Sequence, residues 1–154
     1  MTSSTSPLPS TLTPPPPIIN YRLPANLKPT LYELTIKPYI GTNETYGDKA
    51  FTYEGTMKMT FDCLNATNKI IFHTLEQKIN SSKLVLLNGD GSPSGLSITS
   101  TDIDLLRDFF IINLNGACIQ SQNYVLVVEY TGVIRVELNG FYRSSYLASN
   151  GETR

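Results

Sequence analysis

The sequence predicts an all-β fold, either a sandwich or a large curved antiparallel sheet, and three observations favour it. Apolar and polar residues alternate along residues 51–61, "FTYEGTMKMTF", which is the period of a half-buried antiparallel strand. Other short apolar segments are separated by Asn/Asp-Gly steps and similar turn residues, a spacing typical of sandwiches. Helical periodicity is not convincing over more than one turn, so architectures built on helices are disfavoured.

The first 19 residues differ in composition from the rest of the chain. Residues 1–19 are rich in Ser, Thr and Pro and include a run of prolines at 14–17. Proline favours an extended conformation, and this segment has too little apolar surface to offset the entropy lost on ordering. Residues 1–19 are therefore expected to be disordered, as a linker, an O-glycosylated cell-surface stalk or a plain tail. Residues 20–154 are expected to form one β-domain.

Short strands are expected throughout this domain. In the first, "TLYELTIKP" (30–38), Tyr32, Leu34 and Ile36 share one face. Further strands are expected at "NKIIFHTL" (68–75), "SKLVLL" (82–87), "DFFIINL" (108–114) and "NYVLVVEYTG" (123–132). Turn residues separate them at 41–47, 88–95 and 115–116. A last strand-like stretch, residues 133–146, includes "LNGFYRSSY".

Composition excludes several classes of protein. With 154 residues, of which 40% are hydrophobic, the chain can form one domain with a substantial core. The formal net charge of −1 gives no basic excess, so no nucleic-acid partner is expected. The longest apolar runs, such as Phe109–Ile112, fall far short of the ~18 residues that span a bilayer. The N-terminus also lacks a signal-peptide pattern, so neither a signal nor a transmembrane segment is predicted within this chain.

The residues that could carry chemistry are few. His73 is the only histidine, whereas a hydrolytic zinc site draws two or three histidines, or histidine with glutamate. His73 is therefore interpreted as a strand residue. The acidic stretch 102–108, "DIDLLRD", fails as an EF-hand because Arg107 and Asn113 stand where glycine and glutamate are required. No catalytic, cofactor-binding or metal-binding residue is predicted.

Two kinds of covalent modification are suggested. N-glycosylation sequons begin at Asn43, Asn65 and Asn80, all in expected loops or at strand ends. A chain this rich in Asn, Ser and Thr produces about two sequons by chance, so their number alone is weak support. Cys63 and Cys118 have two interpretations, as a pair of buried thiols or as one disulfide, and both stay open.

Four segments, in order and at suitable spacing, resemble the N-terminal domain of the aminopeptidase N family of zinc exopeptidases. In "YRLPANLKPTLYELTIKP" (21–38), the matching residues are Arg22, Leu23, Pro24, Pro29, Tyr32, Leu34, Ile36 and Pro38. The other three segments are "FTYEGTMKMTFDC" (51–63), "TNKIIFHTLEQKI" (67–79) and "YVLVVEYTGVIRVELNGFYRSSY" (124–146).

This resemblance implies a β-rich, saddle-like first domain that packs on a thermolysin-like catalytic domain. It implies a parent enzyme that removes N-terminal residues from peptides, with zinc held by the catalytic domain and no cofactor in this chain. The chain would be scaffold and docking surface, with the parent's catalytic domain as its partner and peptide substrates met only indirectly. Family members with such a stalk are membrane ectoenzymes, so the extracellular face of the plasma membrane, or secretion, is implied.

The family's exopeptidase and H-E-x-x-H motifs do not occur in this sequence, so the chain alone is predicted to be inactive. The pairing partner of residues 141–146 is expected in sequence beyond this chain, which would make the domain incomplete at its C-terminal side. The alternative is a free-standing extracellular β-sandwich that binds a partner without enzymatic activity.

Overall fold

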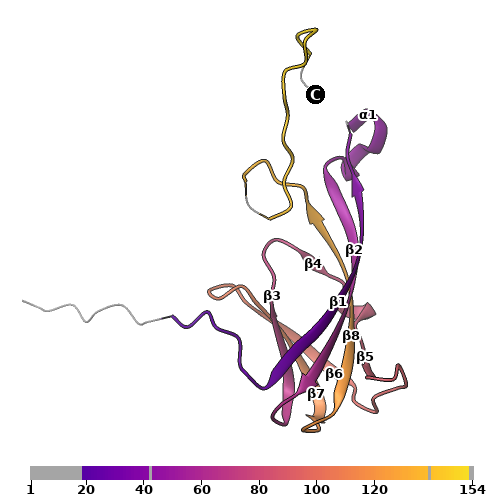
Figure 1. Cartoon of the computed structure of the whole chain (residues 1–154), viewed down its shortest axis with the longest axis vertical. Helices are drawn as coiled ribbons and strands as arrows, with labels where there is room; N and C mark the ends of the chain where they lie inside the picture. The colour runs from indigo at the N-terminus through magenta and orange to yellow at the C-terminus, as the bar shows by residue number, and fades with distance from the viewer. Residues whose placement is uncertain (1–18, 42, 139, 153–154) are drawn as a thin grey trace, which may run out of the picture.

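The computed structural model describes residues 19–41, 43–138 and 140–152, and it consists of two antiparallel sheets (Figure 1). The larger, five-stranded sheet contains β1 (Leu27–Tyr39), β2 (Thr52–Cys63), β8 (Asn123–Val133), β4 (Lys78–Ile79) and β5 (Val85–Asn88). The smaller sheet contains β3 (Thr67–His73), β7 (Phe109–Cys118) and β6 (Ile98–Asp104). Single turns of helix are α1 (Asn43–Tyr46), η1 (Gly47–Lys49) and η2 (Ser81–Lys83). The predicted all-β antiparallel class is confirmed; the predicted stalk lies outside the described residues except for Ile19.

The long strands β2 and β8 form the centre of the larger sheet. They pair along their whole length, with Tyr53 opposite Gly132 and Met59 opposite Leu126. The short strands β4 and β5 both pair with the other side of β8, while β1 pairs with β2 and forms the opposite edge of the sheet.

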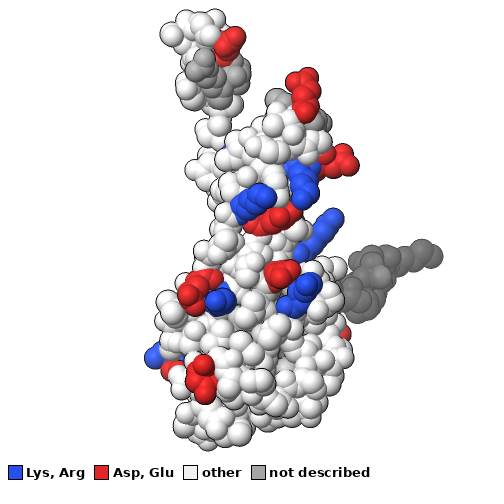
Figure 2. Space-filling model, turned by 90° about the vertical axis from the view of Figure 1, so that its right-hand side faces the viewer, with Lys and Arg blue, Asp and Glu red and all other residues white. Residues whose placement is uncertain are grey.

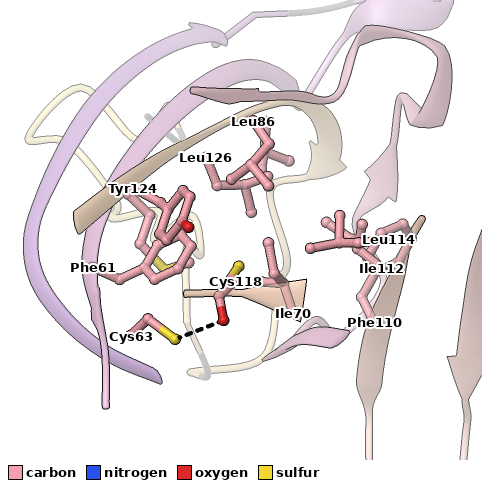
Figure 3. Packing of buried hydrophobic residues seen from close by; sticks show 12 residues of the cluster. Phe61, Cys63, Ile70, Leu86, Phe110, Ile112, Leu114, Cys118, Tyr124 and Leu126 are labelled. Atoms are coloured by element: carbon pink, nitrogen blue, oxygen red, sulfur yellow. Dashed lines mark hydrogen bonds between the residues drawn. The ribbon is translucent and has the colours of Figure 1, made fainter. Parts of the chain in front are cut away.

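The hydrophobic core lies between the two sheets (Figure 3). Alternate residues of β2 and β8 supply one side of it, and the rings of Phe61 and Tyr124 stack there at 5.8 Å. Ile70 of β3 and Ile112 of β7 supply the other side and are fully buried. The alternation predicted for residues 51–61 is confirmed within β2, because Tyr53, Gly55, Met59 and Phe61 are buried whereas the residues of the other face are not. On the buried face, Met57 is only partly buried, and Phe51 precedes the strand with a φ of 56°.

Strand β1 is exposed over nearly its whole length. Its row Tyr32, Leu34 and Ile36 lies on the same face of the sheet as the buried Met59, but these side chains remain 53%, 57% and 44% exposed. The smaller sheet covers the face at β2 and β8 and leaves this outer row uncovered. The edge strand therefore presents apolar side chains to solvent.

The strand expected over residues 133–146 is not formed as one strand. Strand β8 ends at Val133, and Gly140 has a φ of 66°, a left-handed conformation that glycine adopts without strain. The chain returns so that the Arg143 amide donates to the Arg135 carbonyl at 2.8 Å, next to a single parallel bridge between Arg135 and Tyr142. This segment extends beyond both sheets (Figure 1).

Candidate functional site

His73 and the acidic stretch have structural surroundings. His73 ends β3, where its Nε2 lies 3.0 Å from the Tyr21 carbonyl oxygen and its ring meets that of Phe109 edge-on at 5.0 Å. Asp104 forms an ion pair with Arg107, and this hydrogen-bonded pairing holds the pKa of the Asp104 carboxyl below its usual value. Within the described residues, no group of three or more His, Cys, Asp or Glu side chains could hold a metal ion.

The two cysteines lie next to each other in the core. Cys63 ends β2 and Cys118 ends β7, both fully buried, with Cys63 Sγ 3.4 Å from the Cys118 carbonyl oxygen (Figure 3). Burial raises the pKa of the Cys63 thiol, and burial with the nearby Cys63 raises the pKa of Cys118 to about 11. Such thiols stay protonated at neutral pH and are poor nucleophiles. Both are free thiols in the structure, and their proximity keeps the disulfide as a prediction.

The three sequons lie in different settings. Asn65 is exposed in the connection between β2 and β3, and Asn80 is exposed in the connection that leads into η2. Ser82 of the third sequon donates to Asn80 Oδ1 at 2.8 Å. Asn43 begins α1, in a segment predicted as a loop, and its side chain lies outside the described part. Asn65 and Asn80 are thus accessible in the folded chain, and glycosylation of all three sites stays a prediction.

Two hollows on the surface have different characters. One, of about 170 Å³, lies between the start of β1 and β3, with Leu27, Tyr32 and Ile70 in its lining. This volume is below the ~300–1,000 Å³ of typical ligand pockets. The other, of about 540 Å³, lies across the larger sheet and carries charges of both signs, among them Lys37 and Glu129. Acidic and basic side chains are also interspersed on the face shown in Figure 2, so this face has no large patch of one sign.

An aromatic cluster at one end of the larger sheet was not predicted from the sequence. The Tyr53 ring meets Tyr130 at 6.2 Å and Phe141 at 5.2 Å, both in edge-on geometry. The Gln77 amide donates to the Tyr53 hydroxyl at 3.3 Å. Burial, followed by the charge of nearby Tyr53, raises the pKa of Tyr130. The cluster connects β2 and β8 to the segment that follows β8.

We call residues 134–138 and 140–147 the C-terminal arm. Arg135 anchors it through an ion pair with Glu76 at 3.0 Å, and a second ion pair, with Glu137 at 3.3 Å, lies within the arm itself. The Arg143 guanidinium lies 3.8 Å from the centre of the Phe51 ring, a favourable cation–π distance. Beyond these anchors the arm is exposed and apolar, and its side chains at 61–77% exposure are Val136, Leu138, Tyr146 and Leu147.

The arrangement of the C-terminal arm suits contact with another protein surface. Its base is fixed by rings, an ion pair and backbone hydrogen bonds, whereas the rest of the described chain leaves its large apolar side chains exposed. Exposed apolar groups that lie close together mark interaction sites more often than scattered single residues do. No helix among the described residues is long and apolar enough to cross a membrane.

Comparison with known proteins relates most of this chain to one family of peptidases. The profile of the peptidase M1 N-terminal domain matches residues 28–154. Human aminopeptidase N is 30% identical over 132 residues, which cover 84% of this chain and 13% of the human protein. Chicken aminopeptidase Ey is 31% identical over 136 residues, again 84% of this chain and 13% of the relative.

A more distant relative is the membrane alanyl aminopeptidase of Manduca sexta, 25% identical over 140 residues, 86% of this chain and 14% of that protein. The chain thus spans only about 13% of the length of human aminopeptidase N and of chicken aminopeptidase Ey. The family match at residues 28–154 covers most of the chain. The chain therefore belongs to the peptidase M1 family and carries that family's N-terminal domain.

Proposed function

We propose that this chain is the non-catalytic N-terminal domain of a zinc aminopeptidase that removes N-terminal residues from peptides. Its role is to act as scaffold and docking surface for the catalytic domain of the same protein. The C-terminal arm carries this proposal, because an anchored segment with exposed Val136, Leu138 and Leu147 is suited to packing on a neighbouring domain. Covering each of these side chains contributes roughly 1.5–3 kcal/mol to docking.

The chemistry belongs elsewhere in the parent protein. The described residues do not fit a zinc site, since His73 already contacts the Tyr21 carbonyl and no cluster of three suitable side chains surrounds it. Cys63 and Cys118 are buried with raised pKa values, which disfavours metal binding by their thiolates. Zinc would therefore be held by the catalytic domain, and this chain would position that domain without taking part in a chemical step.

The same proposal places the protein outside the cell. One relative is described as a membrane alanyl aminopeptidase, and the Ser/Thr/Pro composition of residues 1–19 suits a stalk between a membrane and a folded head. The exposed Asn65 and Asn80 are compatible with passage through a secretory pathway. We propose the extracellular face of the plasma membrane, or secretion, as its location.

Two experiments test this function. The transcript downstream of the codon for Arg154 should encode H-E-x-x-H with a downstream glutamate. In the protein expressed from that whole transcript, Leu138→Asp with Leu147→Asp should lower aminopeptidase activity and thermal stability together, because charges would enter the docking surface. Leu105→Asp is the matched control, since Leu105 is 84% exposed in the turn after β6.

Equal activity and stability in the arm variant and the Leu105→Asp control would show that the arm is not part of the docking surface. A stop codon directly after Arg154, with secretion of the chain alone, would instead favour the free-standing binding module.

A further inference from the structure

Strand β1 has a long free edge. It is the last strand of the larger sheet within the described residues (Figure 1). Each of residues 28–38 is exposed. Most exposed edges in proteins are short, or they are interrupted by bulges or charges that prevent pairing with other chains. Between Leu31 and Tyr39 the pairing with β2 has no register shift, so no bulge interrupts this part of the edge.

The backbone groups that face the free edge can be assigned. The Tyr39 carbonyl oxygen accepts a hydrogen bond from the Phe51 amide at 2.8 Å, so the polar groups of Tyr39 point toward β2. Because this direction alternates along an antiparallel strand, the groups of Ile36, Leu34 and Tyr32 point away from β2. Pro38 falls in the same outward set, which is where a proline without an amide is tolerated.

When two copies of β1 are placed side by side in opposite directions, the side chains of one copy complement those of the other. We propose that β1 pairs antiparallel with β1 of a second copy of this chain, with the two-fold axis at Thr35. This register places Glu33 opposite the second copy's Lys37, and Lys37 opposite the second copy's Glu33. It also places Leu34 opposite the second copy's Ile36, and both of these residues direct their backbone groups outward as hydrogen-bonded pairs require.

Shifting the two-fold axis by one residue in either direction removes the pairing of opposite charges. An axis at Leu34 places Glu33 opposite the second copy's Thr35 and leaves both charges without an opposite partner. An axis at Ile36 places Glu33 opposite Tyr39, with the same result. Opposite charges across an antiparallel pair favour association and like charges oppose it, so the Thr35 register is selected by charge.

The apolar residues on one face of β1 also favour pairing with a second copy of the chain. Tyr32, Leu34 and Ile36 lie beside Met59, Met57 and Gly55 of β2 and are about half exposed. In the proposed dimer the two rows become adjacent on one face and form a continuous apolar strip across both copies. An isologous contact of this kind closes at two copies, because each β1 has only one free edge.

Charge reversal tests the interface directly. Sedimentation velocity over a range of concentrations should show a monomer–dimer equilibrium for the unchanged chain. Glu33→Lys alone, or Lys37→Glu alone, should weaken association about tenfold, because two opposite-charge pairs become like-charge pairs. An equal mixture of the two variants should dimerise again, since a dimer with one copy of each variant restores opposite charges across both pairs. The double variant should also dimerise, because it exchanges the two charges without changing their complementarity.

Lys58→Glu is the matched control. Lys58 is the partner of Glu33 within the sheet, so this variant removes the same β1–β2 charge pair without altering the free edge. It should dimerise like the unchanged chain. All exchanged side chains are exposed or half-exposed, and far-UV circular dichroism checks that each variant folds.

Three results would overturn the proposal. A monomer at all concentrations, or single variants that dimerise as well as the unchanged chain, would show that β1 does not pair with a second copy. In a longer protein of this family, hydrogen exchange offers a further distinction. Protection of the Leu34 and Ile36 amides that does not depend on concentration would assign the edge to another strand of the same protein and exclude the dimer.

Discussion

Gly132 lies directly against the ring of Tyr53, its partner across the β2–β8 pair. A Cβ atom at Gly132 would lie 2.4 Å from Tyr53 Cζ, well inside van der Waals contact. The arrangement is repeated two residues away, where Gly55 faces the ring of Tyr130 and a Cβ would again lie 2.4 Å from the ring. Two glycines thus make room for two tyrosine rings, and Tyr53 in turn contacts Phe141 of the C-terminal arm.

Gly132→Ala should lower the free energy of unfolding by about 1–3 kcal/mol, the usual cost of overpacking. The Tyr53 ring cannot move aside without losing its contacts with Tyr130, Phe141 and Gln77. Urea denaturation measures the change. Gly116→Ala is a suitable control, because the nearest atom to its Cβ is a Leu96 methyl group at 3.1 Å, which a small shift can relieve. A loss no larger than that of the control would mean that the Tyr53 ring is not confined.

Phe141→Ala should loosen the base of the C-terminal arm. The Phe141 ring is the arm's contact with the buried Tyr53, and edge-on aromatic pairs contribute about 1 kcal/mol. The Arg135 and Arg143 amides, which are bonded within the arm, should then exchange about fivefold faster with solvent deuterium. Tyr146→Ala is the control, since Tyr146 is 65% exposed. Unchanged exchange would show that Arg135 and the backbone bonds hold the arm without the ring.

The alternation of apolar and polar residues predicted the burial of those strands that have one face covered along most of their length. Residues 51–61 alternate in sequence and in burial, because β2 has a neighbouring strand on each side and a second sheet over one face. The row Tyr32, Leu34 and Ile36 alternates equally well, yet it is exposed. How far one sheet covers another depends on long-range packing, which alternation along one strand does not encode.

The C-terminal arm shows a second limit of local pattern. Residues 133–146 have the composition of a strand, but a loop that includes Gly140 brings residue 143 back beside residue 135. The aromatic cluster was also missed, since it depends on which residues face Gly55 and Gly132 across the β2–β8 pair. Once that register is known, the two glycines opposite tyrosines identify the cluster.

Asn65 and Asn80 should carry N-glycans when the chain is expressed through a secretory pathway. Both are exposed in connections between elements, where a glycan needs no rearrangement of the sheets. Digestion with N-glycanase should lower the mass of the secreted chain, and Asn65→Gln and Asn80→Gln should each remove one part of that shift. Asn43→Gln tests the third predicted site in the same assay. Secreted material without any mass shift would contradict both the modification and the proposed location.

From the positions of the two cysteines, we expect the stability of the folded chain to depend on whether they are oxidised to a disulfide. The contact between Cys63 Sγ and the Cys118 carbonyl oxygen places both residues in the same part of the core. A bond between them would close a long loop and contribute about 4 kcal/mol in the loop-entropy account, less any strain. Protein made in an oxidising compartment should show no reactive thiol after denaturation. Two thiols per chain in that titration would rule the bond out.

Reduced protein should lose stability as the pH rises from 9 toward 11. Burial raises the pKa of Cys118 from 9.0 to about 11 and raises that of Cys63, so the folded chain keeps thiol protons that the unfolded chain releases. Between these values the unfolded state binds fewer protons, and the free energy of unfolding falls with rising pH. For Cys118 the loss by pH 11 is roughly 2–3 kcal/mol. The measurement is urea denaturation from pH 8 to pH 11, with Cys63→Ala/Cys118→Ala as the control for all other titrating groups. The oxidised chain has no thiol to titrate and should follow the control. If the reduced chain also follows the control, the thiols titrate alike in both states and their burial has no effect on stability.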